Sequence, residues 1–167
     1  MTDKLTPQRR SWNMSRIRSA DTKPEIVLRS VLHRMGFRFR VNCKELPGRP
    51  DIVLPKYRTV IFVHGCFWHQ HPGCNEAVRP KTNTKYWTTK LDRNVNRDME
   101  NRRTLLEDGW KVFRFWECEI EKEPVHIATQ IGKELRGDAQ GSPHYQIPNR
   151  TILLKAAEAR AGCSKKC

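Results

Sequence analysis

The sequence predicts an α/β fold, in which helices pack against a mixed sheet. Apolar residues recur at helical spacing within residues 22–36, 85–108 and 124–135. Apolar runs of strand length lie at 37–41, 51–54, 59–63 and 110–116. One helix, three strands, a helix, a strand and a helix therefore follow one another, and this order is typical of a mixed sheet covered by helices.

The first helix has the clearest ends. Thr22 and Glu25 have the spacing of a capping box, Pro24 lies in the first turn, and Gly36 supplies a C-terminal stop. The apolar positions between these ends are Leu28, Val31, Leu32 and Met35. After the helix, apolar and Arg side chains alternate over 37–41, which predicts a strand with one apolar face.

The next two strands are expected to form a β-hairpin, because a turn-like tetrapeptide separates them. If Leu54 pairs with Thr59, the antiparallel register places Asp51 beside Val63. His64 then leaves the sheet at the same end.

Residues 64–85 are rich in His, Gly, Pro and Cys and predict a long irregular loop. Loops of this length inside a compact domain are usually functional. The helix that follows ends at Gly109 and should direct its apolar residues inward, namely Trp87, Leu91, Val95, Leu105 and Leu106.

We expect three segments along the chain. Residues 1–20 form a basic arm, residues 21–135 form the folded domain, and residues 136–167 form a C-terminal extension. Partial disorder and a last strand at 151–154 are expected in this extension.

The charge balance points to a polyanionic partner. The chain has 32 Lys and Arg residues against 18 Asp and Glu, a net charge of +14, and surplus cations supply the sequence-independent part of nucleic-acid affinity. No apolar run reaches the roughly 20 residues that span a bilayer, and the N-terminus has no apolar signal region. We therefore expect a soluble intracellular protein, in which six Cys are thiols or metal ligands rather than disulfides.

The densest concentration of reactive side chains is His64-Gly-Cys-Phe-Trp-His-Gln-His-Pro-Gly-Cys74. His71 and Cys74 have the spacing of half a zinc site. Asp98 lies on the inward face of a helix, where a carboxylate needs a partner or a metal, and Cys118 follows the last strand. We therefore expect these four residues to bind Zn(II); the alternative is that Asp98 pairs with Arg102 and the cysteines are buried thiols.

Asp51 begins one strand beside the end of its partner and next to the His-rich loop. A carboxylate placed there can hold a hard cation such as Mg(II) against a phosphate. The alternative is a turn aspartate after Pro50.

Three motifs together resemble the very short patch repair (Vsr) endonuclease family, a branch of the PD-(D/E)xK nuclease superfamily. They are Pro50-Asp51, Val60-Ile-Phe-Val-His-Gly-Cys-Phe-Trp-His69 and Trp116-Glu-Cys118. The resemblance runs from about Trp12 to Cys118. It implies a restriction-endonuclease-like fold with a zinc-pinned loop.

The resemblance also implies an activity and a setting. The protein would be a monomeric, Mg-dependent enzyme of the bacterial cytoplasm, associated with the nucleoid. It would nick double-stranded DNA 5′ to the mispaired T of a T:G mismatch left by deamination of 5-methylcytosine, and other repair proteins are conceivable partners.

The same resemblance assigns roles to residues. Asp51 and the main-chain carbonyl of Val63 would bind two Mg(II) ions, His69 with Glu25 nearby would orient or deprotonate the attacking water, and His64 would contact the phosphate. One structural Zn(II) would be held by His71, Cys74, Asp98 and Cys118.

Three features of the sequence depart from, or complicate, this pattern. Val63 and Gly65 stand where the superfamily has a carboxylate and a Lys, and Pro72-Gly73 is one residue longer than expected. A role in the capping box explains the presence of Glu25 equally as well as a catalytic role does.

Mismatch recognition would use apolar wedges. Phe67, Trp68 and Trp87 would enter the base stack from the major groove and Met14 from the minor groove, although core packing explains Trp87 equally well. Four arginines of the arm would bind phosphates unless the arm is merely solvated, namely Arg9, Arg10, Arg16 and Arg18.

Two other functions are considered, a zinc-stabilised binder of distorted DNA that does not cut and a restriction-type nickase of the same fold. Asp51 together with His69 favours an enzyme, because a binder needs neither at one sheet end. No role is assigned to Cys43, Cys66, Cys163 and Cys167.

Overall fold

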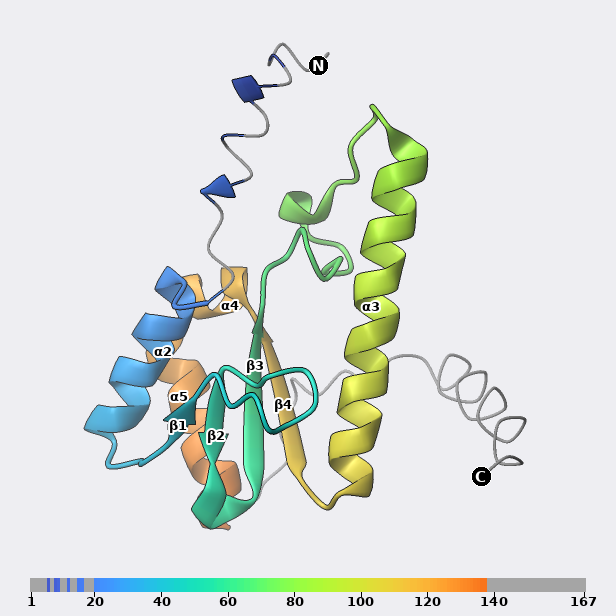
Figure 1. Cartoon of the computed structure of the whole chain (residues 1–167). Helices are drawn as coiled ribbons and strands as arrows, with labels where there is room; N and C mark the ends of the chain where they lie inside the picture. The colour runs from blue at the N-terminus through green and yellow to red at the C-terminus, as the bar shows by residue number, and fades with distance from the viewer. Residues whose placement is uncertain (1–5, 7, 10–11, 13–14, 17–19, 138–167) are drawn as a thin grey trace, which may run out of the picture.

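The computed structural model describes residues 6, 8–9, 12, 15–16 and 20–137 of the chain. Within them, a four-stranded sheet in the order β1-β2-β3-β4 has helices on both faces (Figure 1). The predicted mixed sheet flanked by helices is therefore confirmed. The strand expected at 151–154 lies outside the described residues, as do Arg10, Met14 and Arg18.

The sheet consists of β1 (Arg40–Val41), β2 (Ile52–Leu54), β3 (Thr59–His64) and β4 (Lys111–Trp116). β1, β2 and β3 pair antiparallel, and β3 pairs with β4 in parallel. Leu54 lies opposite Thr59, which confirms the predicted hairpin register. The first strand is shorter than predicted, because Phe37 turns into the core and packs edge-on against Tyr57 instead of entering the ladder.

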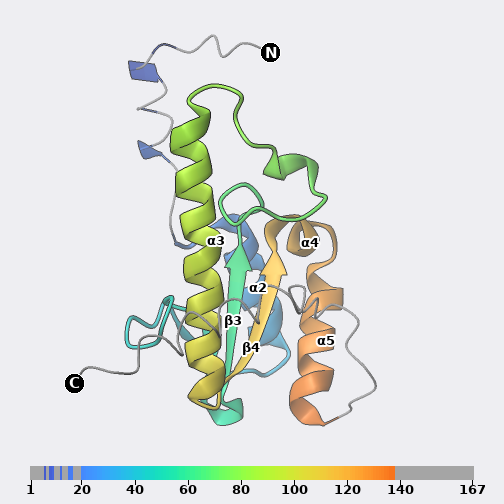
Figure 2. The same cartoon turned by 90° about the vertical axis from the view of Figure 1, so that its right-hand side faces the viewer.

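The long helices are α2 (Lys23–Arg34), α3 (Thr84–Glu107) and α5 (Pro124–Arg136). α2 and α5 cover one face of the sheet and α3 covers the other (Figure 2). A further short helix, α4 (Glu117–Lys122), was not predicted. It begins directly after β4, where a Glu119 carboxylate oxygen accepts a hydrogen bond from the Trp116 amide at 3.0 Å.

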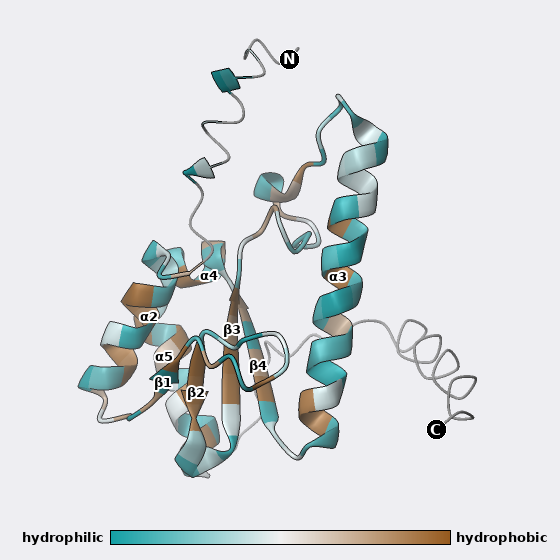
Figure 3. Cartoon of the chain, viewed as in Figure 1, coloured by the Kyte–Doolittle hydropathy of each residue, from teal (hydrophilic) through white to brown (hydrophobic). Residues whose placement is uncertain are grey.

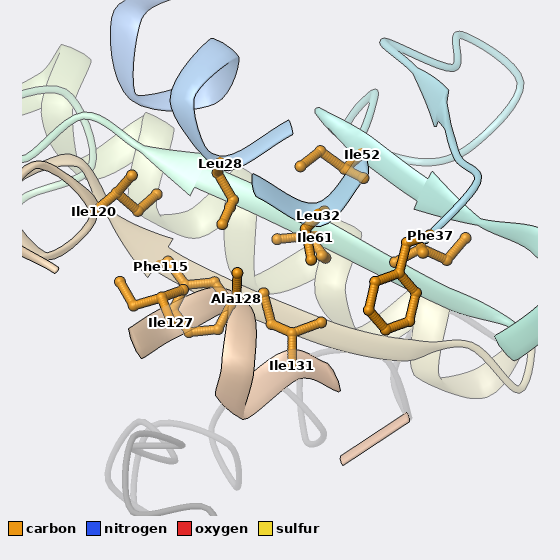
Figure 4. Close-up of a cluster of buried hydrophobic side chains, with 11 residues drawn as sticks. Leu28, Leu32, Phe37, Ile52, Ile61, Phe115, Ile120, Ile127, Ala128 and Ile131 are labelled. Atoms are coloured by element: carbon orange, nitrogen blue, oxygen red, sulfur yellow. The ribbon is translucent and has the colours of Figure 1, made fainter. Parts of the chain in front are cut away.

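Apolar residues are concentrated on the strands and recur along the helices (Figure 3), and the side chains of the larger cluster lie between the sheet, α2 and α5 (Figure 4). The larger cluster joins Leu28 and Leu32 of α2 to Ile127 and Ile131 of α5 on one face of the sheet. The smaller cluster packs α3 on the opposite face and comprises Val53, Val60, Leu105 and Val112. Leu106 was predicted to point inward but is 43% exposed, because it lies about 100° around the helix from buried Leu105.

The parallel strands β3 and β4 end at the same edge of the sheet, beside α4 and the loop after β3 (Figure 2). The loop spans residues 65–83 and includes a short 3₁₀ turn, Asn75–Ala77. The functional residues are therefore expected at this strand edge, where loop and strands meet.

Among the described helices, none combines the length and apolar character needed to cross a membrane.

Candidate active site and metal centre

A cleft of about 1400 Å³ opens at the end of β3. The loop after β1 and the side of α3 contribute to its walls. The predicted catalytic residues all line it, namely Glu25, Asp51, Val63, His64 and His69. Asp98 lines the same cleft.

Asp51 and Val63 are adjacent, as the hairpin register predicts. The Val63 amide donates a hydrogen bond to Oδ2 of Asp51 at 2.7 Å. The N–H and C=O of one strand residue point to the same side, so the Val63 carbonyl also points toward Asp51. A carboxylate oxygen and a carbonyl oxygen side by side are donors that suit a hard cation such as Mg(II).

Burial raises the pKa of Asp51 to about 6. The Val63 hydrogen bond lowers this pKa, the charge of Glu25 raises it, and the charges of Arg29 and His69 lower it. The ionised carboxylate is therefore costly without a cation beside it, which is the environment expected of a metal ligand.

Two histidines and one carboxylate form a cluster next to Asp51. The rings of His64 and His69 stack with their centroids 3.9 Å apart, and Nδ1 of His69 contacts Oδ2 of Asp98 in a short hydrogen bond. Burial, with the nearby charges of His69, Arg114 and Arg97, lowers the pKa of His64 well below its ordinary value. His64 is therefore neutral at pH 7, whereas Asp98 orients the ring of His69.

The structure places Asp98 away from the predicted zinc ligands, which corrects the expected set. Cys66 lies with His71, Cys74 and Cys118 instead, and the ligand atoms of these four residues are all within 4.8 Å of one another. The physical reason is the fold of the loop. It returns His69 rather than His71 to α3, so Asp98 meets an imidazole that lines the cleft.

The Cys66–His71–Cys74–Cys118 cluster fits zinc by its donor chemistry. Nδ1 of His71 lies 3.4 Å from the sulfurs of Cys66 and Cys118, and tetrahedral Zn–S and Zn–N bonds imply a separation of roughly 3.5 Å. The His71 ring stacks on Trp116 at 4.2 Å, which fixes its orientation. Burial raises the pKa of the Cys66 thiol, and a bound cation would reverse that effect.

Sequence reasoning left Cys66 unassigned, although its spacing from His71 could have identified it. The Cys66 amide also donates to Oε1 of Glu117 at 2.6 Å, so the residue directly after β4 holds the second residue after β3. Glu117 lines the cleft and was likewise missed. This contact joins the cysteine cluster to the cleft.

Glu25 is buried in the cap of α2. Its Oε1 accepts from the hydroxyl of Thr22 at 2.8 Å, and its Oε2 accepts from the amide of Asp21 at 3.0 Å and from Arg29 at 2.7 Å. The carboxylate is thus committed to its own helix, although it borders the cleft. This geometry favours the capping role over proton transfer.

The three predicted wedge aromatics lie together beside the cleft. The Phe67 ring is 5.0 Å from Trp68 and 5.5 Å from Trp87, in edge-to-face arrangements. All three are partly exposed, and Lys90 places its ammonium 5.3 Å from the Trp68 ring. Trp87 therefore belongs to a surface cluster rather than to the main core.

Of the four arginines named in the arm, the structure describes Arg9 and Arg16. Their guanidinium carbons lie 4.7 and 4.8 Å from the ring centre of Trp12. Both arginines are exposed. Their charges are therefore available at the surface, as phosphate contacts require.

Comparison with known proteins gives consistent matches. A family model described as DNA mismatch endonuclease Vsr matches residues 2–76. The type II nicking enzyme V.XorIIP of Xanthomonas oryzae is 48% identical over 120 residues, which are 72% of this chain and 88% of the relative.

Two further relatives show comparable similarity. The type II nicking enzyme V.NmeAIP of Neisseria meningitidis is 46% identical over 125 residues, covering 75% of this chain and 89% of the relative. The DNA mismatch endonuclease Vsr of Escherichia coli is 47% identical over 118 residues, covering 71% of this chain and 73% of the relative.

Proposed function

Because the chain belongs to the Vsr family of DNA endonucleases, we propose that it nicks duplex DNA at T:G mismatches with the aid of Mg(II). Family membership makes the protein a DNA nicking endonuclease and excludes the non-cutting binder. The cut is proposed to lie 5′ to the mispaired T, which deamination of 5-methylcytosine creates. The observation that carries this proposal is the meeting of Asp51, Val63 and the His69–Asp98 pair in one cleft beside partly exposed aromatics.

The residues divide the chemistry between them. Asp51 and the Val63 carbonyl would hold Mg(II), two ions in all, and this cation supplies charge neutralisation and activation of water at the scissile phosphate. His69 is oriented through Nδ1 by Asp98, so its Nε2 is left to accept a proton from the attacking water. His64, being neutral, would hydrogen-bond the phosphate rather than neutralise it.

The remaining parts of the chain are proposed to bind and hold. Residues 21–135 form the nuclease domain, the arm 1–20 contacts DNA, and residues 136–167 are an extension. One Zn(II) in the Cys66–His71–Cys74–Cys118 cluster would fix the loop that carries His69 and the aromatics. The enzyme is proposed to act as a monomer, because one cleft contains every residue that the chemistry needs.

The decisive experiment uses end-labelled duplexes that differ at one base pair. With Mg(II), the protein should nick the T-containing strand of a T:G duplex at one position and leave the C:G duplex intact. Asp51→Ala should remove this activity, because the cation loses its carboxylate ligand. A T:G duplex that stays intact, or equal nicking by the variant, would contradict the proposal.

The same duplexes separate the restriction-type alternative. Several relatives, V.XorIIP and V.NmeAIP among them, are named type II nicking enzymes, so a nickase that responds to sequence alone is a specific rival. Such an enzyme would cut the C:G duplex as readily as the T:G duplex at the same site.

Trp68→Ala should weaken mismatch discrimination without weakening phosphate contacts. Stacking of one aromatic on a base contributes about 1–3 kcal/mol, so the preference for T:G over C:G binding should fall by roughly 5- to 150-fold. The dependence of affinity on salt should keep its slope, because no phosphate contact is lost. Fluorescence anisotropy at several salt concentrations measures both, with Leu106→Ala at the far end of α3 as the control; an unchanged preference would exclude Trp68 as a wedge.

A further inference from the structure

We propose that Arg29, which lies outside every motif identified in the sequence, is a positioning residue that fixes Asp51 in the cleft. The inference rests on the role proposed above for Asp51. Arg29 itself does not reach the reacting atoms. It acts on the main chain that carries the catalytic carboxylate.

Arg29 connects two separate elements through its guanidinium group. Nη2 donates to Oε2 of Glu25 at 2.7 Å and to the main-chain carbonyl of Asp51 at 3.1 Å. Nη1 donates to Oδ1 of Asp21 at 2.5 Å. The N-terminal end of α2 is thereby tied to the start of β2.

The burial of this contact distinguishes it from a surface ion pair. The side chain of Arg29 is 12% exposed and that of Glu25 is 4% exposed. Nε of Arg29 is buried and has no hydrogen-bond partner among the described residues. A buried N–H without a partner is costly, so the orientation of the guanidinium is set by the acceptors of its two terminal nitrogens.

Asp51 depends on such a tie because it lies beyond the strand ladder. The first paired residue of β2 is Ile52, opposite Ile61, and Asp51 directly precedes it. The Asp51 carbonyl is held by Arg29, and the Asp51 carboxylate is held by the Val63 amide. Loss of the first contact should therefore loosen the second, although Val63 itself is unchanged.

Amide exchange measures this directly and does not depend on activity. In Arg29→Met, exchange of the Val63 amide proton, followed by nitrogen-15 NMR, should become at least about fivefold faster, because its acceptor is less firmly placed. Exchange of Val60 in the same strand should not change. Arg34→Met is the matched control, since it removes one arginine from the same helix, where Arg34 contacts Ser30 on the surface.

Kinetics supply the second measurement. Displacement of a catalytic group by about 1 Å can cost 10²-fold in rate, so kcat for nicking the T:G duplex should fall at least about tenfold in Arg29→Met. The KM for DNA should stay within about twofold, as in Arg34→Met. A KM that rises with kcat unchanged would identify Arg29 as a phosphate contact and overturn the proposal.

A second pair of variants covers failure of Arg29→Met to fold, because that change leaves buried Glu25 without its counter-charge. Glu25→Gln keeps an acceptor in the cap, so Glu25→Gln/Arg29→Met buries no unpaired acid. Relative to Glu25→Gln alone, the double variant should show the same acceleration at Val63. Equal rates of Val63 amide exchange in the single and double variants would overturn the proposal. If Val63 exchange accelerates as expected but the wild-type protein does not nick the T:G duplex, only the proposed function is overturned.

Discussion

Asp51→Asn is expected to abolish nicking and, in buffer without divalent cations, to stabilise the folded protein at pH 8. Loss of the cation-binding carboxylate should lower kcat by at least about 10³-fold. Stability should rise in the same variant because Asn is neutral. Asn also retains an oxygen that accepts the hydrogen bond from the Val63 amide.

The sign of the stability effect follows from the pKa of Asp51, which burial raises from 3.8 to about 6. The folded state therefore binds more protons than the unfolded state between these two pH values, and stability falls as pH rises through this window. Above pH 6 the ionised carboxylate costs about 3 kcal/mol. The advantage of Asn should be largest at pH 7–8 and about half as large at pH 5.

Urea unfolding at pH 5 and pH 8 measures this difference, and Asp108→Asn at the exposed end of α3 serves as the control. Added Mg(II) should stabilise the wild-type protein and leave Asp51→Asn unchanged, because only the carboxylate binds the cation. A variant that is less stable than wild type at pH 8 would show that Asp51 is held mainly by attractive contacts. In that case a bound metal would not be needed to offset the cost of burying the Asp51 charge.

The parts of the fold that local patterns control were predictable. The capping box of α2 and the Leu54–Thr59 register were both predicted and are present. The register was decisive, because it places Asp51 beside Val63 from the sequence pattern alone. α4 was missed since a six-residue helix is too short to show a helical period.

The error over Asp98 has a physical explanation. Helical spacing correctly placed Asp98 on the face of α3 that meets the His-rich loop, and burial correctly demanded a partner for it. Spacing cannot tell which loop residue that partner is, because the loop path depends on tertiary contacts such as the one between Glu117 and the Cys66 amide. His69 takes Asp98, and Cys66 joins the sulfur cluster.

Cys66→Ser and Asp98→Asn should therefore fail in opposite ways. Cys66→Ser should lose most of the roughly one equivalent of zinc expected in the purified protein and, with it, the position of His69, because a hydroxyl is a poor replacement for a thiolate ligand. Asp98→Asn should keep its zinc and its melting temperature but lower kcat by roughly 10²–10⁴-fold. The reason is that an amide does not hold the His69 imidazole in the tautomer that leaves Nε2 free to accept a proton.

Metal analysis and nicking rates on the same preparations distinguish the two assignments. Cys118→Ser should behave like Cys66→Ser, and Cys43→Ser should behave like wild type, because Cys43 lies outside the cluster. If instead Asp98→Asn released zinc and Cys66→Ser retained it, the ligand set inferred from spacing would be right. Asp98 would then hold the loop through the metal, and the imidazole of His69 would need another group to orient it.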